Sequence, residues 1–345
     1  MTSTGNADAA KRAGVALAAT SLVSLPLVAG FFGWLHPALD SFSHFRVHLA
    51  VLLAICAVWL LATRARLHGA VALALAAGAY VTAYPPSSWD SRASAAVLPA
   101  AMDEPVYRLL QLNLQWDSPA PEKALALISQ ADADVITLDE VSEPWRARLA
   151  EVSDAYPFRL DCQGDPKFGS VMILSRRPMI DAEGSGCRER RGFAVATIDF
   201  DGRAVEVAAV HLAWPWPKTQ FEEVRDLAPR LSALSDATIA AGDFNSVPWS
   251  AVFRTFVQAG GFAEPVRLGP TWIHKRLPRR LRRLGGLELD HVLVKRGLRL
   301  RDIRRLNDAG SDHLPVLTEF SIRDQPPAGQ VAFARTSGAA RPGGS

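Results

Sequence analysis

The sequence predicts an α/β protein in which two packed β-sheets are flanked by helices, and it places three transmembrane helices before this domain. Two observations lead to this prediction. The N-terminal part of the 345-residue chain is rich in Ala, Leu and Val, whereas the remainder has the composition of a water-soluble domain. In that remainder, strand patterns alternate with fewer helical ones, and strand–helix–strand repeats are scarce. This arrangement favours two packed sheets over a doubly wound parallel sheet.

Composition supports a folded protein without indicating an anionic partner. Apolar residues make up 49% of the chain, which suffices for a packed core and excludes a disordered or fibrous protein. The formal net charge is only +3, so overall charge does not indicate a nucleic acid or any other anionic ligand. Any such preference has to come from local charge.

Three apolar runs predict the transmembrane helices. They extend over residues 13–35, 47–63 and 69–84. None contains a carboxylate, and each is about as long as a helix that crosses a hydrocarbon core of ~30 Å, although the second and third are at the short end. Trp34, Tyr80 and Tyr84 lie near the ends of the runs, as aromatic residues of a membrane interface do. Two spans, or a re-entrant segment, are the alternatives.

Basic residues in the short flanks predict the orientation. Lys11 and Arg12 precede the first run. Arg64 and Arg66 follow the second run, and only Arg46 lies between the first two. Because Lys and Arg concentrate on the cytoplasmic side, the N-terminus is expected inside the cell. Three crossings of the cell membrane then place the rest of the chain on the extracytoplasmic side.

Composition also divides the chain into four parts. Residues 1–86 are the expected membrane anchor, and residues 87–104, rich in Ser, Ala and Pro, predict a linker. A folded domain is expected over residues 105–323. Residues 324–345 contain many Pro, Gly, Ala and Ser residues and predict a disordered tail.

Cysteine positions agree with an oxidising compartment. Cys162 and Cys187 both lie in the expected soluble domain, where they can form a disulfide. Such a bond closes a loop of about 25 residues and contributes ~3 kcal/mol on the chain-entropy model. Two unrelated free thiols are the alternative. Cys56 lies in an expected span as a small apolar residue.

The soluble part alternates expected strands and helices. Strand patterns cover residues 106–114, 135–138, 170–174, 194–200, 205–212, 237–241, 292–294 and 316–322. A helix is expected over residues 121–130, with Pro at its first position. A second is expected over residues 221–234, with a kink at Pro229. Asp201 and Gly202 predict a tight turn between two strands.

Residues capable of chemistry stand at or near the ends of these strands. They are Gln111, Asn113, Asp139, Glu140, His211, Asp243, Asn245, Asp290, His291, Asp312 and His313. Each segment alone is a weak signal, because Asp and Asn often follow strands as turn formers. Their joint presence in this order is a strong one.

In these segments the chain resembles the endonuclease/exonuclease/phosphatase superfamily. This group includes pancreatic-type deoxyribonuclease, abasic-site endonucleases, inositol polyphosphate 5-phosphatases and neutral sphingomyelinases. The resemblance covers roughly residues 106–322, and residues 241–249, 269–272 and 310–315 resemble the bacterial membrane-anchored branch. It implies a hydrolase of phosphoester bonds. It also implies a four-layer α/β sandwich, whose two mostly antiparallel sheets bring the strand ends together at one edge.

A divalent metal is expected beside Glu140. Mg²⁺ prefers oxygen ligands and retains several waters, so one or two carboxylates hold it. Glu140 is the best candidate ligand, and a solvated acid at a strand end is the alternative. The resemblance implies that Asn113 and Asp312 help to position the ion, with Mn²⁺ as a substitute for Mg²⁺. Such an ion would polarise a phosphoryl oxygen and stabilise the leaving group.

The other polar residues are expected to act on the phosphate. In an extended Asp-x-Asn segment, Asp243 and Asn245 point to the same side of the strand. The resemblance implies that Asp243 orients or deprotonates the attacking water and that Asn245 binds the transition-state oxygens. His211 and His313 are candidates for proton transfer, because imidazole titrates near neutral pH. The resemblance pairs His313 with Asp290; buried structural histidines are the alternative.

Two positions relate the chain to branches of the superfamily. His211 resembles the deoxyribonuclease, phosphatase and sphingomyelinase branches, whereas abasic-site endonucleases carry Tyr there. Asp139 departs from the Gln that commonly precedes the metal-binding Glu. The substitution adds a charge near the metal, and its role is open at this point.

A basic run and several tryptophans are candidates for substrate contact. Residues 274–283 contain one His, one Lys and five Arg residues. They could bind a nucleic-acid backbone or the anionic surface of a bilayer, or form a solvated loop. Trp residues beside the motifs could wall the cleft, insert into lipid or simply pack. The residues proposed for this contact are Arg276, Arg279, Trp214 and Trp249.

Two enzymatic interpretations follow. One is a nuclease that acts on DNA or RNA outside the cytoplasm, and the other is a phosphodiesterase or phosphatase for a lipid head group. A membrane anchor raises the local concentration at the bilayer and slightly favours the second. A non-catalytic sensor or interaction domain is less consistent, because every chemically demanding position is occupied. The sequence indicates no protein partner.

Overall fold

The computed structural model describes residues 2–63, 65–85, 104–163, 169–180, 184–187 and 192–323. The expected tail, Arg64 and all of the expected linker except Glu104 lie outside these residues.

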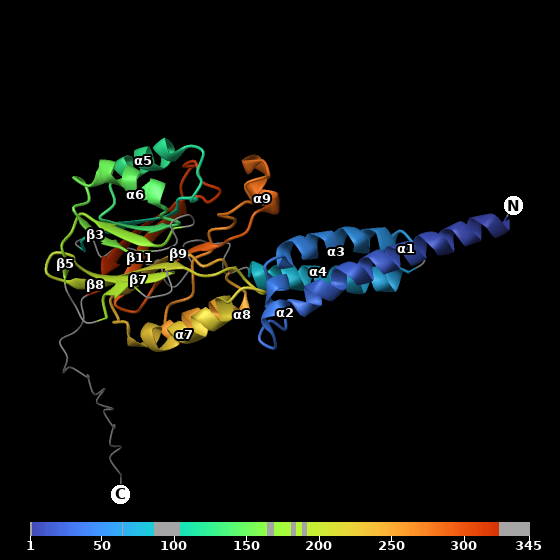
Figure 1. The fold of residues 1–345 in the computed structure, drawn as a ribbon. Coiled ribbons are helices and arrows are strands. Elements are labelled where there is room, and N and C mark those ends of the chain that lie inside the picture. Colours follow the sequence, from blue (N-terminus) through green and yellow to red (C-terminus); the bar gives the residue numbers. More distant parts are fainter. Residues whose placement is uncertain are drawn as a thin grey trace, which may run out of the picture.

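Two six-stranded sheets form the centre of the C-terminal domain (Figure 1). The first has the order β11-β12-β1-β2-β4-β3, and the second has the order β10-β9-β8-β7-β5, with β6 also paired to β7. The strands of the first sheet are β1 (Tyr107–Asn113), β2 (Val135–Asp139), β3 (Phe158–Asp161), β4 (Met172–Ser175), β11 (Leu298–Arg305) and β12 (Val316–Ile322). Those of the second are β5 (Met179–Ile180), β6 (Gly186–Cys187), β7 (Phe193–Asp199), β8 (Ala204–His211), β9 (Thr238–Asp243) and β10 (Asp290–Val294). Only the β1–β2 and β8–β9 pairs are parallel among these.

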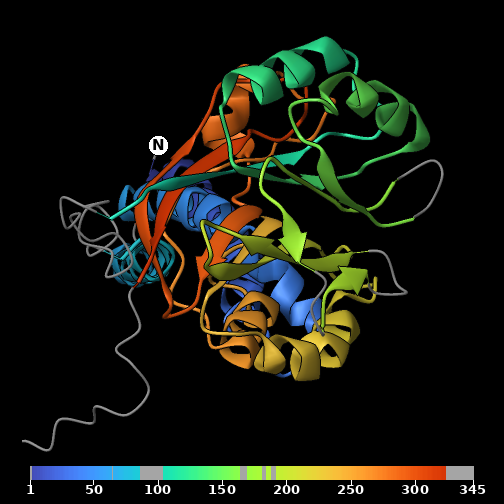
Figure 2. The same ribbon diagram turned by 90° about the vertical axis from the view of Figure 1, so that its left-hand side faces the viewer.

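Helices cover the outer face of each sheet. They are α5 (Pro121–Gln130), α6 (Glu143–Leu149) and the short helix η2 (Ala150–Val152) over the first sheet, and α7 (Gln220–Ala233) and α8 (Ala251–Gly260) over the second. Figure 2 shows the two helical layers on opposite sides of the packed sheets. The expected four-layer α/β sandwich is therefore confirmed.

Strand sequences explain why the sheets are buried on both faces. In β8, Val205 and Val207 face the apolar core between the sheets, whereas Ala208 and Val210 contact the apolar residues of α7 and α8. Successive side chains of a strand point to opposite faces, so a continuous apolar run buries both.

Four helices precede this domain. They are α1 (Thr2–Ala29), α2 (Pro37–Ser43), α3 (Arg46–Leu61) and α4 (Arg66–Ala83). Residues 8–29 and 66–83 are long and apolar enough to cross a membrane, and α2 and α3 give a third crossing only if this pair, bent by 65°, is one span. The first helix ends at Ala29, before the expected end at residue 35, because the chain turns through residues 30–36 into α2.

The N-terminal helices pack directly against the C-terminal domain. The Asp40 carboxylate accepts hydrogen bonds from the backbone amides of Ala251 and Val252, at 2.7 and 3.1 Å, and so caps α8. The indole of Trp249 donates to the carbonyl oxygen of Ser43 at 2.6 Å. The relative position of helices and domain is therefore fixed by buried hydrogen bonds.

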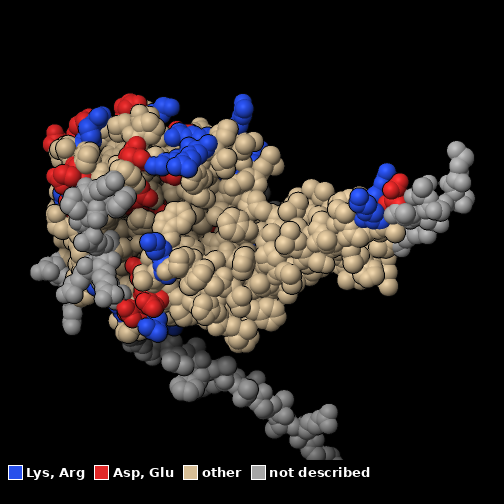
Figure 3. All heavy atoms as spheres, turned by 45° about the vertical axis from the view of Figure 1, so that its right-hand side comes forward, with Lys and Arg blue, Asp and Glu red and all other residues tan. Residues whose placement is uncertain are grey.

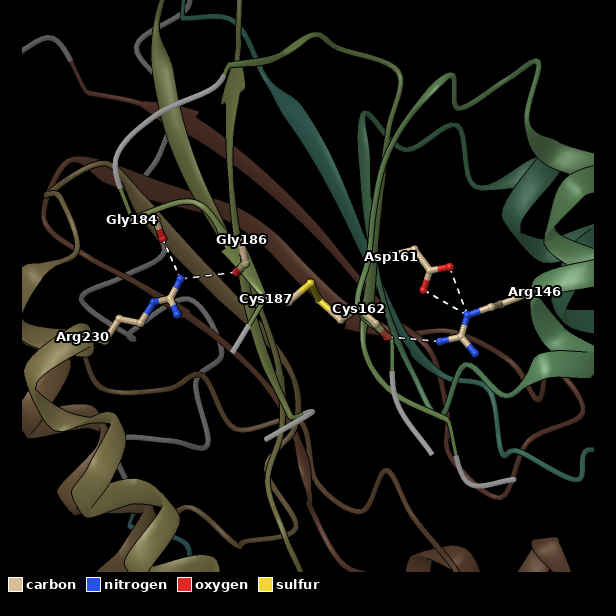
Figure 4. Close-up of a disulfide and its surroundings, with 7 residues drawn as sticks. All are labelled: Arg146, Asp161, Cys162, Gly184, Gly186, Cys187 and Arg230. Atoms are coloured by element: carbon tan, nitrogen blue, oxygen red, sulfur yellow. Dashed lines mark hydrogen bonds and ion pairs between the residues drawn. A yellow bond between two sulfur atoms is a disulfide. The ribbon is translucent and has the colours of Figure 1, made fainter. Parts of the chain in front are cut away.

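A disulfide joins the two sheets. Cys162 follows β3 of the first sheet, and Cys187 is the last residue of β6 in the second (Figure 4). Arg146 donates to the Asp161 carboxylate and to the carbonyl oxygen of Cys162, and so holds the chain beside the bond. The disulfide thus links edges of the domain that hydrogen bonds of the sheets do not join.

We expect the Cys187→Ser variant to lower the free energy of unfolding by ~3 kcal/mol, because the bond closes a loop of about 25 residues in the unfolded chain. Urea denaturation of the protein in detergent, followed by tryptophan fluorescence, measures this change. Reductant should destabilise the native protein equally and leave the variant unaffected. Equal unfolding midpoints for all samples would contradict the expectation.

Candidate active site

Strand register brings the polar residues together at one edge of the sandwich. Asn113, at the end of β1, lies beside Asp139, at the end of the parallel strand β2. In the second sheet, Asp243 at the end of β9 lies between His211 of β8 and Asp290 of β10. Residues distant in sequence therefore share one site.

A buried ion-pair cluster occupies the centre of this edge. The His313 Nδ1 atom lies 2.8 Å from the Asp290 carboxylate, and its Nε2 atom lies 3.6 Å from the Asp243 carboxylate. The His211 Nε2 atom approaches Asp243 from the other side, at 3.8 Å. The sequence interpretation grouped these four residues, and the structure places them in contact.

Electrostatics set the protonation of this cluster. Burial acts to lower the pKa of His313, but the carboxylates of Asp290 and Asp243 outweigh it and raise that pKa well above the usual value. Burial raises the pKa of Asp243 to about 6, although both histidines counteract it. At neutral pH, His313 is an imidazolium that can donate to a phosphoryl oxygen, and Asp243 is ionised and can accept a proton from water.

Local backbone geometry holds Asp243 and Asn245 in place. The backbone amide of Asn245 donates to the Asp243 carboxylate at 2.8 Å, and the Asn245 side chain donates to the carbonyl oxygen of Leu212 at 2.9 Å. Asn245 has a φ of 47°, in the left-handed region. A Cβ atom on Gly242 would lie 1.8 Å from the carbonyl oxygen of Val210, so only glycine allows the two strands to approach here.

A second group of oxygen atoms lies around Glu140. Its carboxylate accepts from the Asn113 side chain at 3.1 Å and from the backbone amide of Trp116 at 2.8 Å. The Asn113 amide also donates to Asp243 at 3.1 Å and so connects the two groups. Glu140 has a φ of 57°, a conformation that is rare outside glycine and that marks functional sites.

This group fits a hard divalent cation. Burial raises the pKa of Asp312, and the negative charge of Glu140 raises it further, so the two carboxylates repel each other across the site. A cation between them would relieve that repulsion, and carboxylate oxygens are the ligands that Mg²⁺ prefers. The side-chain oxygen of Asn113 accepts the backbone amide of Gln115 at 2.9 Å, so in this geometry Asn113 orients Glu140 through its NH₂ group.

Asp243, Asp290 and His313 are also close enough to hold a metal ion, because their ligand atoms lie within 4.8 Å of one another. The Nδ1 atom of His313 is hydrogen-bonded to Asp290. Mg²⁺ prefers oxygen ligands, which favours the group around Glu140 over one that includes an imidazole nitrogen.

Asp139 is a fully buried acid that accepts hydrogen bonds from its neighbours. Its side chain accepts from the Gln111 amide at 3.2 Å and from the backbone amide of Asp243 at 2.8 Å. Burial raises its pKa to about 8, so the carboxyl group is mostly protonated at neutral pH. The expected extra charge beside the metal is therefore largely absent, and Asp139 acts as a buried hydrogen-bonding residue that positions Asp243.

Three further residues support the site: Gln111 was among the strand-end candidates in the sequence, whereas Thr271 and Gln115 were missed. Gln111 donates to both Asp139 and Asp290, and the Thr271 hydroxyl accepts the backbone amide of Asp290 at 3.1 Å. Gln115 accepts the backbone amide of Asp312 at 2.9 Å. Their roles depend on contacts between distant segments, so no local sequence pattern identifies them.

The segment of the chain that carries these site residues matches a known protein family. A sequence model of the Endonuclease/Exonuclease/phosphatase family matches residues 110–313, which include all the candidate catalytic and metal-binding residues. The chain belongs to this family. Members are metal-dependent hydrolases of phosphoester bonds, and the chain is an enzyme of this class. None of the curated proteins matches the chain in sequence.

Several solved structures are similar to part of this chain. Sphingomyelinase C from Streptomyces griseocarneus is 18% identical over 62% of this chain and 99% of its own, with a TM-score of 0.46. A beta toxin variant from Staphylococcus aureus with bound magnesium ions is 16% identical over 63% and 99% of the two chains, with a TM-score of 0.47. The D. rerio TDP2 complex with a single-strand DNA product is 17% identical over 63% and 99%, with a TM-score of 0.48.

The candidates for substrate contact in this endonuclease/exonuclease/phosphatase domain lie in different surroundings. The Trp214 ring packs 5.9 Å from that of Trp272, which lies 6.4 Å from the imidazole of His313, so Trp214 is near the catalytic cluster. Trp249 is buried against the N-terminal helices. Arg279 pairs with Asp308, and Arg276 is exposed to solvent.

A cavity of about 530 Å³ lies beside Glu140 at this edge of the sheets. Its lining includes Trp116 and Ser142, which flank Glu140 in the fold, and the helix residues Trp145 and Arg148. A substrate group next to the metal could extend into this space.

We expect kcat/KM for a soluble phosphodiester to show a bell-shaped dependence on pH. The rate should rise as pH passes through about 6, where Asp243 loses its proton, and fall at alkaline pH, where His313 loses its own. Asp290→Asn should move the alkaline limb to lower pH, whereas Glu122→Gln on α5 should leave the profile unchanged. Coincident profiles for the native enzyme and Asp290→Asn would contradict the assignment.

Proposed function

We propose that the chain is a membrane-anchored, Mg²⁺-dependent phosphodiesterase that acts on the extracytoplasmic side of the cell membrane. The observation that carries this proposal is the position of Glu140 and Asp312 beside the buried Asp243, His313 and Asp290 cluster. One sheet edge thus presents metal ligands, a base and a cationic donor to the same phosphate.

Each residue has a role that its contacts support. Glu140 and Asp312 would hold the ion, which when bound supplies charge stabilisation to a phosphoryl oxygen and the leaving group. Asp243 orients the attacking water and accepts its proton. His313, kept protonated by Asp290, donates from Nε2 to a phosphoryl oxygen. Asn245 and His211 lie where they can hydrogen-bond the remaining oxygens.

The N-terminal helices support membrane insertion. Large apolar side chains such as Leu22, Leu25 and Ile55 are exposed on their outer surface. Figure 3 shows that the face in view has almost no charged residues between the domain and the far end of the helices. Exposed apolar surface of this extent is stable in a bilayer and costly in water.

The arrangement of the helices supports the proposed orientation. The N-terminal end of α1, which precedes Lys11 and Arg12, lies at the end of the bundle remote from the C-terminal domain (Figure 1). Basic residues favour the cytoplasmic side, which leaves the domain outside. The Cys162–Cys187 disulfide agrees with an oxidising compartment.

We expect alkaline phosphatase fused after residue 323 to be active in cells, because this reporter folds only outside the cytoplasm. A fusion of the same reporter at residue 63, after α3, is the matched control and should be inactive. The reverse pattern of activities would contradict the proposed orientation.

We expect the full chain in detergent micelles to hydrolyse bis(p-nitrophenyl) phosphate with Mg²⁺, and to lose this activity in excess chelator. Asp243→Asn and His313→Ala should each lower kcat by roughly 10²–10⁴-fold, because each removes a proton-transfer group. Glu140→Gln should raise the Mg²⁺ concentration needed for half-maximal activity. Glu122→Gln, an exposed acid on α5, is the control for charge removal.

Activity that persists in chelator, or in both Asp243→Asn and His313→Ala, would rule out the proposed mechanism.

A further inference from the structure

The basic segment 274–285 lies against the N-terminal helices. It contains the short helices η3 (Arg279–Leu281) and α9 (Arg282–Gly285). His48, near the start of α3, and Leu284 of this segment line the same cavity. This cavity, of about 190 Å³, lies between the basic segment and helices α3 and α4. Its lining also includes Tyr80 of α4 and Arg283. The segment therefore lies at the level where α3 and α4 meet the domain.

A second loop of the domain also contacts the N-terminal helices. The carbonyl oxygen of Trp216 accepts a hydrogen bond from the Ser41 hydroxyl of α2 at 3.5 Å. Trp214, in the same loop, is 54% exposed. Segments 212–219 and 274–285 thus flank the helices at their junction with the domain, and we call these two segments the rim.

The rim exposes apolar side chains among basic ones. Leu277, Leu281 and Leu284 are all exposed, and Leu284 is 76% accessible. Leu277 lies in the turn before η3, Leu281 is the last residue of η3, and Leu284 lies in α9. Arg276, Arg280 and Arg283 are exposed beside them in the sequence. Large apolar groups with interleaved arginines suit the boundary between head groups and acyl chains, whereas a nucleic-acid backbone requires only the arginines.

The same two segments continue into the catalytic site. Trp214 packs on Trp272, and Trp272 packs on His313 and donates from its indole to the Asp312 carboxylate at 3.2 Å. Arg282 donates to the carbonyl oxygen of Asp312 at 3.1 Å. The rim is therefore in contact, through Trp272 and Arg282, with the candidate site residues Asp312 and His313.

We propose that the rim rests on the bilayer that the N-terminal helices cross, and that the substrate is the phosphodiester of a phospholipid head group in that bilayer. This inference rests on the proposed function. The leucines and tryptophans enter the apolar boundary, and the arginines bind lipid phosphates. In the reaction, the water oxygen bonds to phosphorus, one phosphorus–oxygen ester bond breaks, and the proton of the water passes to the released alcohol.

Contact with the bilayer can be measured independently of activity. The native cysteines are buried or disulfide-bonded, so a Leu284→Cys variant takes a nitrobenzoxadiazole label at one position. Ile180, 40% exposed on β5, is the matched control because β5 lies at the end of the domain remote from the helices (Figure 1). In nanodiscs of phosphatidylcholine and phosphatidylglycerol, nitroxide-labelled lipids should quench the label at position 284 at least fivefold more than that at position 180.

Substrate choice is measured with the full chain in the same nanodiscs. The native enzyme should release phosphorylated head groups or phosphatidate, detected by mass spectrometry. Leu284→Asp should lower the ratio of phospholipid to bis(p-nitrophenyl) phosphate hydrolysis at least tenfold. Ile180→Asp should leave that ratio unchanged.

Different results would overturn the inferred contact with the bilayer and the proposed phosphodiesterase activity. Equal quenching at positions 284 and 180 would overturn the inference, as would cleavage of the soluble diester or of an oligonucleotide without cleavage of phospholipid. Failure of the native enzyme to hydrolyse any of the diesters would instead overturn the proposed function.

Discussion

The site depends on one electrostatic constraint, which is the concentration of buried carboxyl groups at a single sheet edge. Asp139, Asp243 and Asp290 are almost completely buried, and Glu140 and Asp312 lie beside them. Like charges in such a place are costly unless cations or protons neutralise them. The imidazolium of His313 balances Asp290 and Asp243, a proton neutralises Asp139, and a divalent cation between Glu140 and Asp312 would complete the balance. The charges that neutralise these acids are also those that phosphoester hydrolysis requires.

The sheets make this concentration of charge possible. The parallel β1–β2 and β8–β9 pairs end at the same edge, and the antiparallel strand β10 starts there. Buried hydrogen bonds then fix each acid, as Gln111 does for Asp139 and Asp290. Glu140 and Asn245 have left-handed backbone conformations, and the surrounding core offsets their strain.

Sequence patterns predicted much of the architecture, because most strands are short apolar runs bounded by turn residues. Helix α5 and strand β12 were predicted with their observed bounds. Strand β11 was missed because arginines alternate with its apolar residues, and the segment resembles a solvated loop. Helix α8 was missed as well, although Ser250 at its N-cap and Gly261 at its C-terminal end are recognisable signals.

The site was predictable where residue type alone carries the chemistry, as for the acids and histidines at strand ends. It was not predictable where a role depends on contacts between distant segments. Trp249 shows the difference, because its indole binds Ser43 of an N-terminal helix. A neutral Asp139 likewise follows from burial, which the sequence does not reveal.

The protonation of His313 is the most direct test of this account. Nitrogen-15 chemical shifts of the histidine side chains, with His313 assigned by comparison with a His313→Gln variant, report whether both ring nitrogens carry protons. We expect His313 to remain an imidazolium above neutral pH in the native enzyme and to become neutral at lower pH in Asp290→Asn. A neutral His313 ring at pH 7 in the native enzyme would contradict the central claim, because the carboxylates would then lack the cation that balances them.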